Sequence, residues 1–439
     1  MQLSSEIKGY PLRSTLTPDF DRLLPVTSVQ LVVALAAIVL AFVPLVPPVE
    51  ALEGGMTTRG IIEFGLILAA LALLAIYLKL QGAFSFEVRT PGFLVISLFV
   101  VWGMLSCLWS LNPTLTIAKA AELWCLALAA LMIVTIGRRS NFSEGRLETI
   151  LAFSMIAVIC GLIVANLYYW GKPLPNTGDE SLPLDLLGQD FSERPRLILA
   201  YQHALATADL LALPIICLFV SDRSKLTKTV LSAGLLALFW LADARGPAIA
   251  LIAALAALSL LKLRRNSTRA IAVMLTTSFV LAGVLLFHER LPAAIRPFMT
   301  DDVYTLNSRT ELWSHTVTEV LARPILGTGY YASRYVLIKD FSWAGHAHNS
   351  FLEIALTTGL IGLLILAGFV FFICTELFAT RSPLLVGVTL YCLIQGMLNP
   401  QFFSPCLAMF VLTIALLDAG LRKSRASDLT VKTISNDVR

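Results

Sequence analysis

The sequence predicts an all-α, polytopic integral membrane protein with about twelve transmembrane helices and a large extracytoplasmic loop that contains short helices. Of its 439 residues, 57% are hydrophobic and 14% are charged, and the mean hydropathy is +0.79. A soluble domain carries about 25% charged residues, so this composition excludes a water-soluble globular protein. The seven cysteines lie in apolar stretches without CxxC spacing, which is typical of small buried side chains.

A helix needs about 20 apolar residues to cross a hydrocarbon core about 30 Å thick. On this rule, the predicted spans are 28–46, 60–79, 92–110, 114–136, 148–168, 198–220, 227–243, 246–263, 270–287, 350–373, 383–397 and 403–421. The chain is thereby divided into an N-terminal tail, a first part of the bundle, a loop, a second part of the bundle and a C-terminal tail. Their predicted boundaries are 1–25, 26–287, 288–349, 350–421 and 422–439.

The orientation follows from the distribution of Lys and Arg, which favour cytoplasmic loops. If the N-terminus is cytoplasmic, most of the 33 basic residues fall on inside segments, with clusters at 138–139, 223–228 and 264–269. We therefore expect both termini in the cytoplasm and loop 288–349 on the periplasmic side of a bacterial inner membrane. No cleavable signal peptide is expected, because residues 1–24 are polar and charged.

Two charged residues, Lys119 and Glu122, fall within the predicted fourth span at i, i+3, on one face of a helix. A charge at membrane depth costs several kcal/mol unless a partner or a water-filled cavity is present. Two interpretations stay open. The two residues form an ion pair that stabilises the bundle, or Lys119 lies near the outer end and faces a polar cavity.

Loop 288–349 is far longer than an ordinary connection, and such loops are usually functional. Within it, Ser308 followed by Glu311 is a capping box, and the helix that it begins is expected to end before Pro324. Arg309 then lies in the first turn, beside free backbone N–H groups that favour phosphate. The alternative is an arginine fixed by an aspartate or by lipid headgroups.

The predicted tenth span opens on His346-Ala347-His348-Asn349-Ser350. Ser350 and Glu353 have the spacing of a second capping box, so His348 directly precedes a helix whose N-terminus faces outward. The positive end of a helix disfavours imidazolium, and a neutral His348 can act as a general base near pH 7.

Two other interpretations of this segment stay open. A histidine at a helix start is often a cap or a hydrogen-bonded surface group. His346 and His348 also have a spacing found in metal sites, but they lack a third ligand at compelling spacing. Asp301-Asp302 is more typical of a solvated turn.

Arginines are predicted at other outward-facing helix starts. Arg245 opens the eighth span with Pro247 in its first turn, and Arg194 and Arg196 precede the sixth span. Such a set suits a polyanion at the outer leaflet, for which a lipid-linked diphosphate is the best match. A transporter would instead show polar, broken helices near the midplane, and the sequence indicates few, with Asp209 and Gln395 as the main candidates.

The order of these motifs resembles the O-antigen ligase and O-antigen polymerase superfamily, which includes exopolysaccharide production proteins. The resemblance covers about residues 190–375. It rests on Ala244-Arg245-Gly246-Pro247, Ser308-Arg309-x-x-x-Trp313, Pro324-x-x-Gly327-x-Gly329, His348-Asn349-Ser350-Phe351-Leu352-Glu353 and Gly359-x-x-Gly362. Two stretches depart from the family pattern: 201–206 around His203, and Thr357-Thr358-Gly359.

The resemblance implies a metal-independent membrane glycosyltransferase that needs no cofactor. It would move a glycan from undecaprenyl diphosphate to an acceptor sugar hydroxyl in the periplasm, on the lipid A core for a ligase or on a growing lipid-linked glycan for a polymerase. His348 would be the base, and Arg245, Arg309 and Arg196 would bind the diphosphate.

Supporting roles fall to His346, Lys119 and Asn349. The expected partners are the lipid-linked donor, the acceptor glycan and membrane lipids, with no nucleic acid. The alternatives to a ligase are a polymerase of lipid-linked repeats, a non-enzymatic polysaccharide or lipid exporter and, more weakly, a scaffold subunit of an envelope complex. An exporter would place charges along a central cavity through many spans, whereas here they gather at one face.

Overall fold

The fold is known from a computed structural model of the whole chain. It describes residues 28–43, 58–80, 91–140, 142–169, 187–188, 196–197, 199, 204–242, 244–263, 309–341 and 344–437. The predicted ninth span at 270–287, both tail ends, Ser308 and Asp301-Asp302 lie outside the described residues.

The described chain is helical apart from one pair of short strands, as the composition predicts. The elements are α1 (Ser28–Ala41), α2 (Thr58–Leu80), α3 (Pro91–Leu105), η3 (Ser106–Leu108), α4 (Pro113–Arg139), α5 (Arg146–Tyr169), β1 (Leu187–Gly188), β2 (Arg196–Leu197), α6 (Ala204–Val220), α7 (Lys225–Leu241), α8 (Arg245–Leu263), α11 (Arg309–Ala322), α12 (Arg334–Leu337), α13 (Ser350–Thr380), α14 (Pro383–Gly396) and α15 (Leu407–Asp437).

Each predicted span within the described residues corresponds to one of these helices. Five of them, α2, α3, α4, α5 and α13, are long and apolar enough to cross a membrane, and α1, α6, α8 and α14 contain shorter apolar helices. The number of twelve spans stays a prediction. The sixth span is the main difference: α6 begins at Ala204, because residues 196–197 pair with 187–188 as an antiparallel strand.

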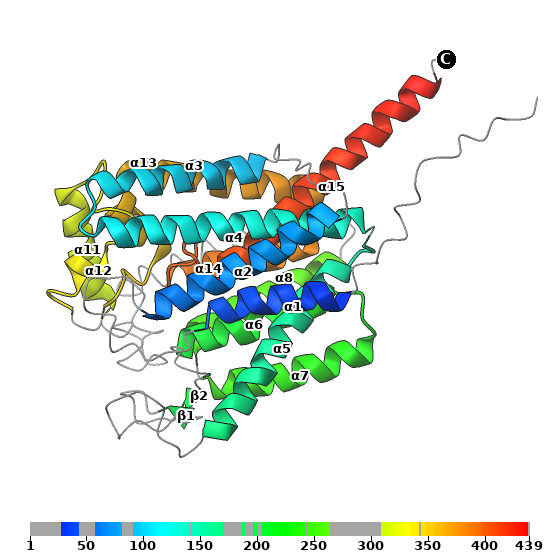
Figure 1. Cartoon of the computed structure of the whole chain (residues 1–439), viewed down its shortest axis with the longest axis horizontal. Coiled ribbons are helices and arrows are strands. Elements are labelled where there is room, and N and C mark those ends of the chain that lie inside the picture. The colour runs from blue at the N-terminus through cyan, green and yellow to red at the C-terminus, as the bar shows by residue number, and fades with distance from the viewer. Residues whose placement is uncertain are drawn as a thin grey trace, which may run out of the picture.

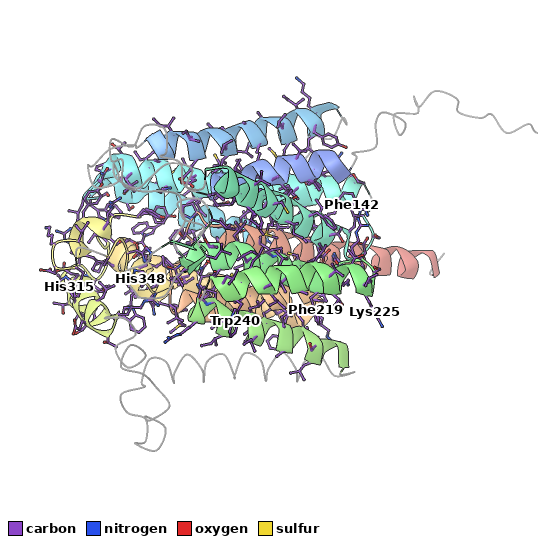
Figure 2. The ribbon with its side chains drawn as sticks, turned by 90° about the horizontal axis from the view of Figure 1, so that it is seen from below. Phe142, Phe219, Lys225, Trp240, His315 and His348 are labelled. Carbon is purple, nitrogen blue, oxygen red and sulfur yellow. The ribbon has the colours of Figure 1, made fainter. Side chains whose placement is uncertain are left out.

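The axes of most long helices are roughly aligned. Helices α11 and α12 gather at one end of the bundle, and the last part of α15 projects beyond the other end (Figure 1). We call these the α11 end and the Arg138 end. His315 and His348 lie at the first, whereas Phe142 and Lys225 lie at the second (Figure 2). Within the bundle, α4 packs on α2, α3 and α15, and α8 packs along α14.

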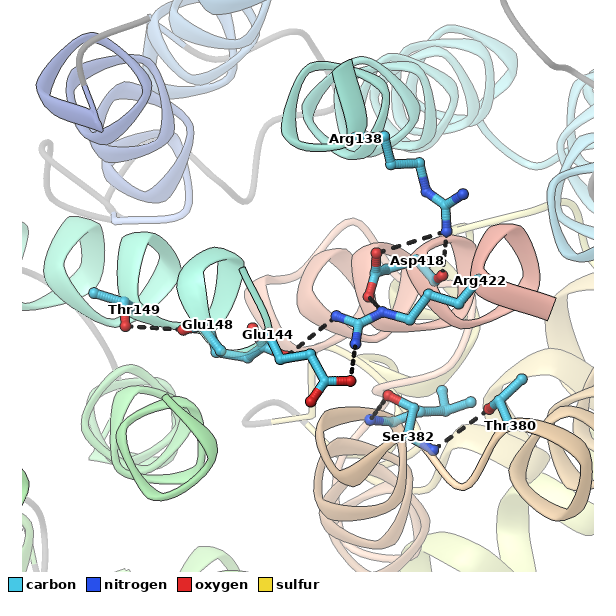
Figure 3. A network of polar contacts seen from close by, with 10 residues as sticks. Arg138, Glu144, Glu148, Thr149, Thr380, Ser382, Asp418 and Arg422 are labelled. Atoms are coloured by element: carbon cyan, nitrogen blue, oxygen red, sulfur yellow. Dashed lines mark hydrogen bonds and ion pairs between the residues drawn. The ribbon is translucent and has the colours of Figure 1, made fainter. Parts of the chain in front are cut away.

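The Arg138 end carries a polar network that ties three helices together (Figure 3). Arg138 of α4 donates to the backbone carbonyl of Asp418 at 2.8 Å. Arg422, one turn further along α15, donates to the Asp418 carboxylate at 2.7 Å and lies 3.9 Å from the carboxylate of Glu148 in α5. Basic residues assigned to the cytoplasm by the charge distribution therefore meet at one end of the bundle.

Helix α13 is broken at Gly359, where the backbone has φ +67° and ψ −163°. The carbonyls of Leu356 and Thr357 accept hydrogen bonds from the N–H groups of Thr328 and Gly329 at 2.9 Å, and Leu360 N–H donates to Pro324 O at 2.8 Å. The segment 324–329 thus replaces the hydrogen bonds that the helix loses.

This break explains why glycine is required at position 327 of one sequence motif and at position 359 of the other. A Cβ on Gly359 would lie 2.1 Å from Ile325 O, and a Cβ on Gly327 would lie 2.6 Å from the carbonyl carbon of Thr357. Both residues also have positive φ, which glycine adopts without steric cost. The break was not visible in the sequence, because the hydropathy is continuous across 350–373.

Candidate functional site

The connection between α14 and α15 joins α8 and α13 at the α11 end. Asn349 Nδ2 donates to Met397 O at 3.2 Å, and Ser350 Oγ donates to Asn399 O at 3.1 Å. On the other side, a Cβ on Gly246 would lie only 2.9 Å from Leu398 Cδ1. The start of α8, with Arg245, and the residues around His348 therefore contact the same connection.

Helix α11 is fixed to the His348 segment through Ala347. Trp313 Nε1 donates to Ala347 O at 2.9 Å, and Trp313 is buried together with Leu312. Arg309, one turn before Trp313, is the first residue of α11. The structure thus brings Arg245, Arg309 and His348 to one end of the bundle, and the helix predicted in the loop is confirmed.

The half-buried carboxylate of Glu353 holds Ala347 from its other side. Glu353 accepts hydrogen bonds from Ala347 N at 2.8 Å and from Ser333 Oγ at 2.5 Å. The Ala347 residue is therefore held at its N–H by α13 and at its carbonyl by α11. This arrangement fixes the backbone directly before His348.

The second predicted capping box needs correction. The N-cap of α13 is Asn349, whose Oδ1 accepts from Phe351 N at 2.9 Å and from Leu352 N at 3.1 Å. Ser350 is the first helical residue, and its Oγ accepts from Gln401 N at 2.7 Å. Glu353 binds Ala347 rather than the N-cap, because the chain before the helix folds back over its first turn.

His348 lies half-buried with φ +49°. This left-handed conformation costs a non-glycine residue about 1 kcal/mol or more and persists where surrounding contacts hold it. The ring centroids of His346 and His348 are 4.1 Å apart, and His348 N–H donates to His346 Nδ1 at 3.1 Å. Among the described residues, no three His, Cys, Asp or Glu side chains gather where a metal ion could be held.

Arg245 and Arg309 differ in solvent exposure, but both lack a nearby carboxylate among the described residues. Arg245 is exposed, whereas Arg309 is half-buried, and burial lowers the pKa of its guanidinium below the ordinary value. Within the described part of the chain, neither arginine has a carboxylate within ion-pair distance. A bound anion would supply Arg309 with the charge partner that burial makes favourable.

Arg196 is not at a helix start. It lies in β2, opposite Gly188 of β1, because α6 begins only at Ala204. The hydroxyl of Thr207, in the first turn of α6, accepts from Leu199 N at 3.2 Å. Arg194 and His203 lie outside the described residues.

Lys119 forms an ion pair and also faces a polar cavity, the two possibilities that the sequence left open. Its Nζ donates to Glu122 Oε2 at 2.6 Å and lies 4.0 Å from Glu63 Oε2 on α2. The same side chain lines a cavity of about 330 Å³ whose wall also includes His346 and Glu353. The ion pair and the polar cavity therefore coexist at the α11 end.

Sequence reasoning did not find several residues of this site. Glu353 was interpreted as part of a cap, and Trp313 only as a motif residue. Glu63 and Tyr331 reach the cavity from α2 and from the segment after α11, so no local spacing connects them with Lys119. An isolated acidic residue near the start of an apolar span was the one signal for Glu63.

The fold and the site define a multi-pass membrane protein with a polar site at one end of its helix bundle. Residues 230–367 match a family model described as O-Antigen ligase. The matched stretch is less than half of the chain, and it includes Arg245, Arg309 and His348. It confirms the resemblance to the O-antigen ligase and polymerase superfamily and supports a membrane glycan transferase of this type. No curated protein matches the chain.

Proposed function

We propose that this protein is a glycosyltransferase of the bacterial inner membrane that moves a glycan from undecaprenyl diphosphate to an acceptor sugar hydroxyl on the periplasmic side, as O-antigen ligases do. The observation that carries the proposal is the family match over 230–367. The α11 end is the periplasmic end in this proposal, and both termini lie in the cytoplasm.

His348 is the base that removes the proton from the acceptor hydroxyl. The N-terminus of α13 favours its neutral form, and the two-sided hold on Ala347 supports a fixed ring position. General base catalysis of this kind contributes about 10²–10⁴-fold to a rate.

Arg309 and Arg245 bind the diphosphate and stabilise the negative charge that develops as it leaves. Arg309 is the stronger candidate, since it is half-buried at a helix start. Arg196 is the weaker one, because it lies in a strand before α6. No metal is required in this scheme, since the arginines supply the positive charge.

Complementation of a deletion strain tests the catalytic assignment. His348→Ala, Arg245→Ala and Arg309→Ala are each expected to abolish or strongly reduce surface glycan at normal membrane levels of protein. His315→Ala is the matched control, because His315 lies on α11 at the same end but contacts Asp340, 3.3 Å away. Full-length surface glycan in all three variants would overturn the assignment.

The lipid-linked product in the deletion strain separates a ligase from a polymerase. A missing ligase leaves long undecaprenyl-linked chains, whereas a missing polymerase leaves single repeats. We favour the ligase, and accumulation of single repeats would assign the polymerase reaction instead. A strain that exports no glycan intermediate to the periplasm would favour an exporter.

A further inference from the structure

A second feature of the α11 end has no role in the scheme above: the cavity beside Lys119. We call it the Lys119 cavity. It has a volume of about 330 Å³, and its walls come from α2, α4, the segment 330–335, the start of α13 and residues 400–404. This volume lies at the lower end of the range for small-molecule sites, about 300–1,000 Å³.

Two aromatic residues that line the Lys119 cavity, Tyr330 and Phe403, pack against Phe99. Phe99 stacks on Phe403 with ring centroids 3.8 Å apart, and it forms a T-shaped pair with Tyr330 at a centroid distance of 5.6 Å. Tyr330 Oη donates to Phe403 O at 2.6 Å. Aromatic packing and a hydrogen bond therefore hold this part of the cavity wall in place.

The charge of the lining does not suit a diphosphate. Glu63, Glu122 and Glu353 contribute three carboxylates, against two cations, Lys119 and Arg334. Lys119 is already engaged with Glu122 at 2.6 Å. A diphosphate in this cavity would meet more negative than positive charge, so the polyanion belongs at Arg309 and Arg245, neither of which lines the cavity.

The same lining suits a neutral ligand rich in hydroxyl groups. Carboxylates accept hydrogen bonds from hydroxyls, and Lys119 and the tyrosine hydroxyls can donate. Tyr331 lies with its ring 5.5 Å from Lys119 Nζ, and burial raises the pKa of its hydroxyl, which therefore stays a neutral donor. Tyr331 and Tyr335 both line the cavity, and aromatic rings can pack against the C–H groups of a sugar.

We propose that the Lys119 cavity is a glycan subsite, which binds a neutral, hydroxyl-rich sugar residue while the arginines outside it hold the diphosphate. This inference rests on the proposed function. It places a sugar hydroxyl beside His346, whose ring adjoins that of His348. The sugar can come from the donor or from the acceptor, and its chemistry is the same in both cases.

Binding measurements on the full-length protein in lipid nanodiscs test this division. Three probes are used: undecaprenyl diphosphate alone, the undecaprenyl-diphosphate-linked glycan from the deletion strain, and lipid A-core glycolipid. Glu63→Gln and Tyr331→Phe change a single polar group, whereas Ala118→Leu fills the cavity without removing a hydrogen bond. Tyr77→Phe on α2 and Ala121→Leu on α4 are the matched controls, since neither residue lines the cavity.

The three cavity variants are expected to weaken binding of a glycan-bearing probe by roughly tenfold. Glu63→Gln and Tyr331→Phe each alter one hydrogen-bonding group, whereas Ala118→Leu takes up space that the sugar needs. Their affinity for undecaprenyl diphosphate alone stays unchanged, which also shows that they are folded. Loss with the lipid-linked glycan assigns the donor sugar, and loss with the lipid A-core glycolipid assigns the acceptor.

The inference is overturned if the cavity variants bind all three probes like the control variants, or if they lose undecaprenyl diphosphate to the same extent as the glycan. Failure of the proposed function gives a different result. In that case Arg245→Ala and Arg309→Ala retain full affinity for undecaprenyl diphosphate, whatever the cavity variants do.

Discussion

The indole nitrogen of Trp313 donates a hydrogen bond of 2.9 Å to the carbonyl oxygen of Ala347. This bond ties the helix that begins at Arg309 to the residue that precedes His348. The proposed anion site and the proposed base are therefore parts of one connected structure, although 39 positions separate them in the sequence (348 − 309).

Trp313→Phe is expected to lower kcat for glycan transfer about five- to tenfold, because it removes this one bond, worth about 1 kcal/mol, and keeps most of the aromatic packing. KM for the lipid-linked donor stays within about twofold if Trp313 acts by positioning His348. Trp109→Phe is the control, since Trp109 Nε1 makes a similar bond of 3.0 Å to Leu326 O. An equal loss of kcat in both variants would show that Trp313 stabilises the fold and does not position His348.

Gly359→Ala is expected to destabilise the protein by about 2 kcal/mol or more, because the new Cβ combines positive φ with a contact 2.1 Å from Ile325 O. Gly368→Ala lies in the same helix with open space around it, and should stabilise by about 0.5–1 kcal/mol. Thermal unfolding of both variants in the same detergent measures the difference. Similar unfolding temperatures would contradict the break in α13.

Asn349→Ala removes the N-cap of α13 and should cost about 1 kcal/mol of stability. It also removes the side-chain hydrogen bonds that hold the backbone next to His348. Glycan transfer activity should therefore fall as well. Ser382→Ala removes the N-cap of α14 and should reduce stability without affecting activity. Asn349→Ser, which retains a capping oxygen, should recover much of the loss, and unaltered activity in Asn349→Ala would show that the cap does not position His348.

Removal of divalent metals is expected to leave glycan transfer unchanged, because the charge of the diphosphate is assigned to arginines. The measurement is transfer in proteoliposomes after treatment with EDTA, compared with an untreated sample. Recovery of a lost activity on addition of Mg²⁺ or Mn²⁺ would assign that charge to a metal instead.

The sequence was sufficient to predict most helices because lipid imposes a simple rule on them. An apolar run of about 20 residues satisfies its own backbone hydrogen bonds and needs no distant partner. Boundaries marked by local chemistry were also accurate, as at Pro113 and Pro383, where α4 and α14 begin. The start of α6 was misplaced by six residues (204 − 198), because the pairing of Arg196 with Gly188 forms only in the folded chain.

The candidate site was only partly predictable for the same reason. Arg245, Arg309 and His348 stand at helix starts, which local spacing can indicate. Glu63 and Tyr331 come close to Lys119 only when α2, α4 and the segment after α11 pack together. Glu353 has the spacing of a cap residue, and only the folded chain shows that it binds Ala347 instead.

The break in α13 has a consequence for how the protein is made. A helix with open carbonyls at Leu356 and Thr357 cannot remain in hydrocarbon by itself, because lipid offers no hydrogen-bond donors. Its donors, Thr328 and Gly329, precede it in the chain and are synthesised first. The order of translation therefore delivers the partner segment before the helix that needs it, and we expect the break in α13 to form against a segment that is already present.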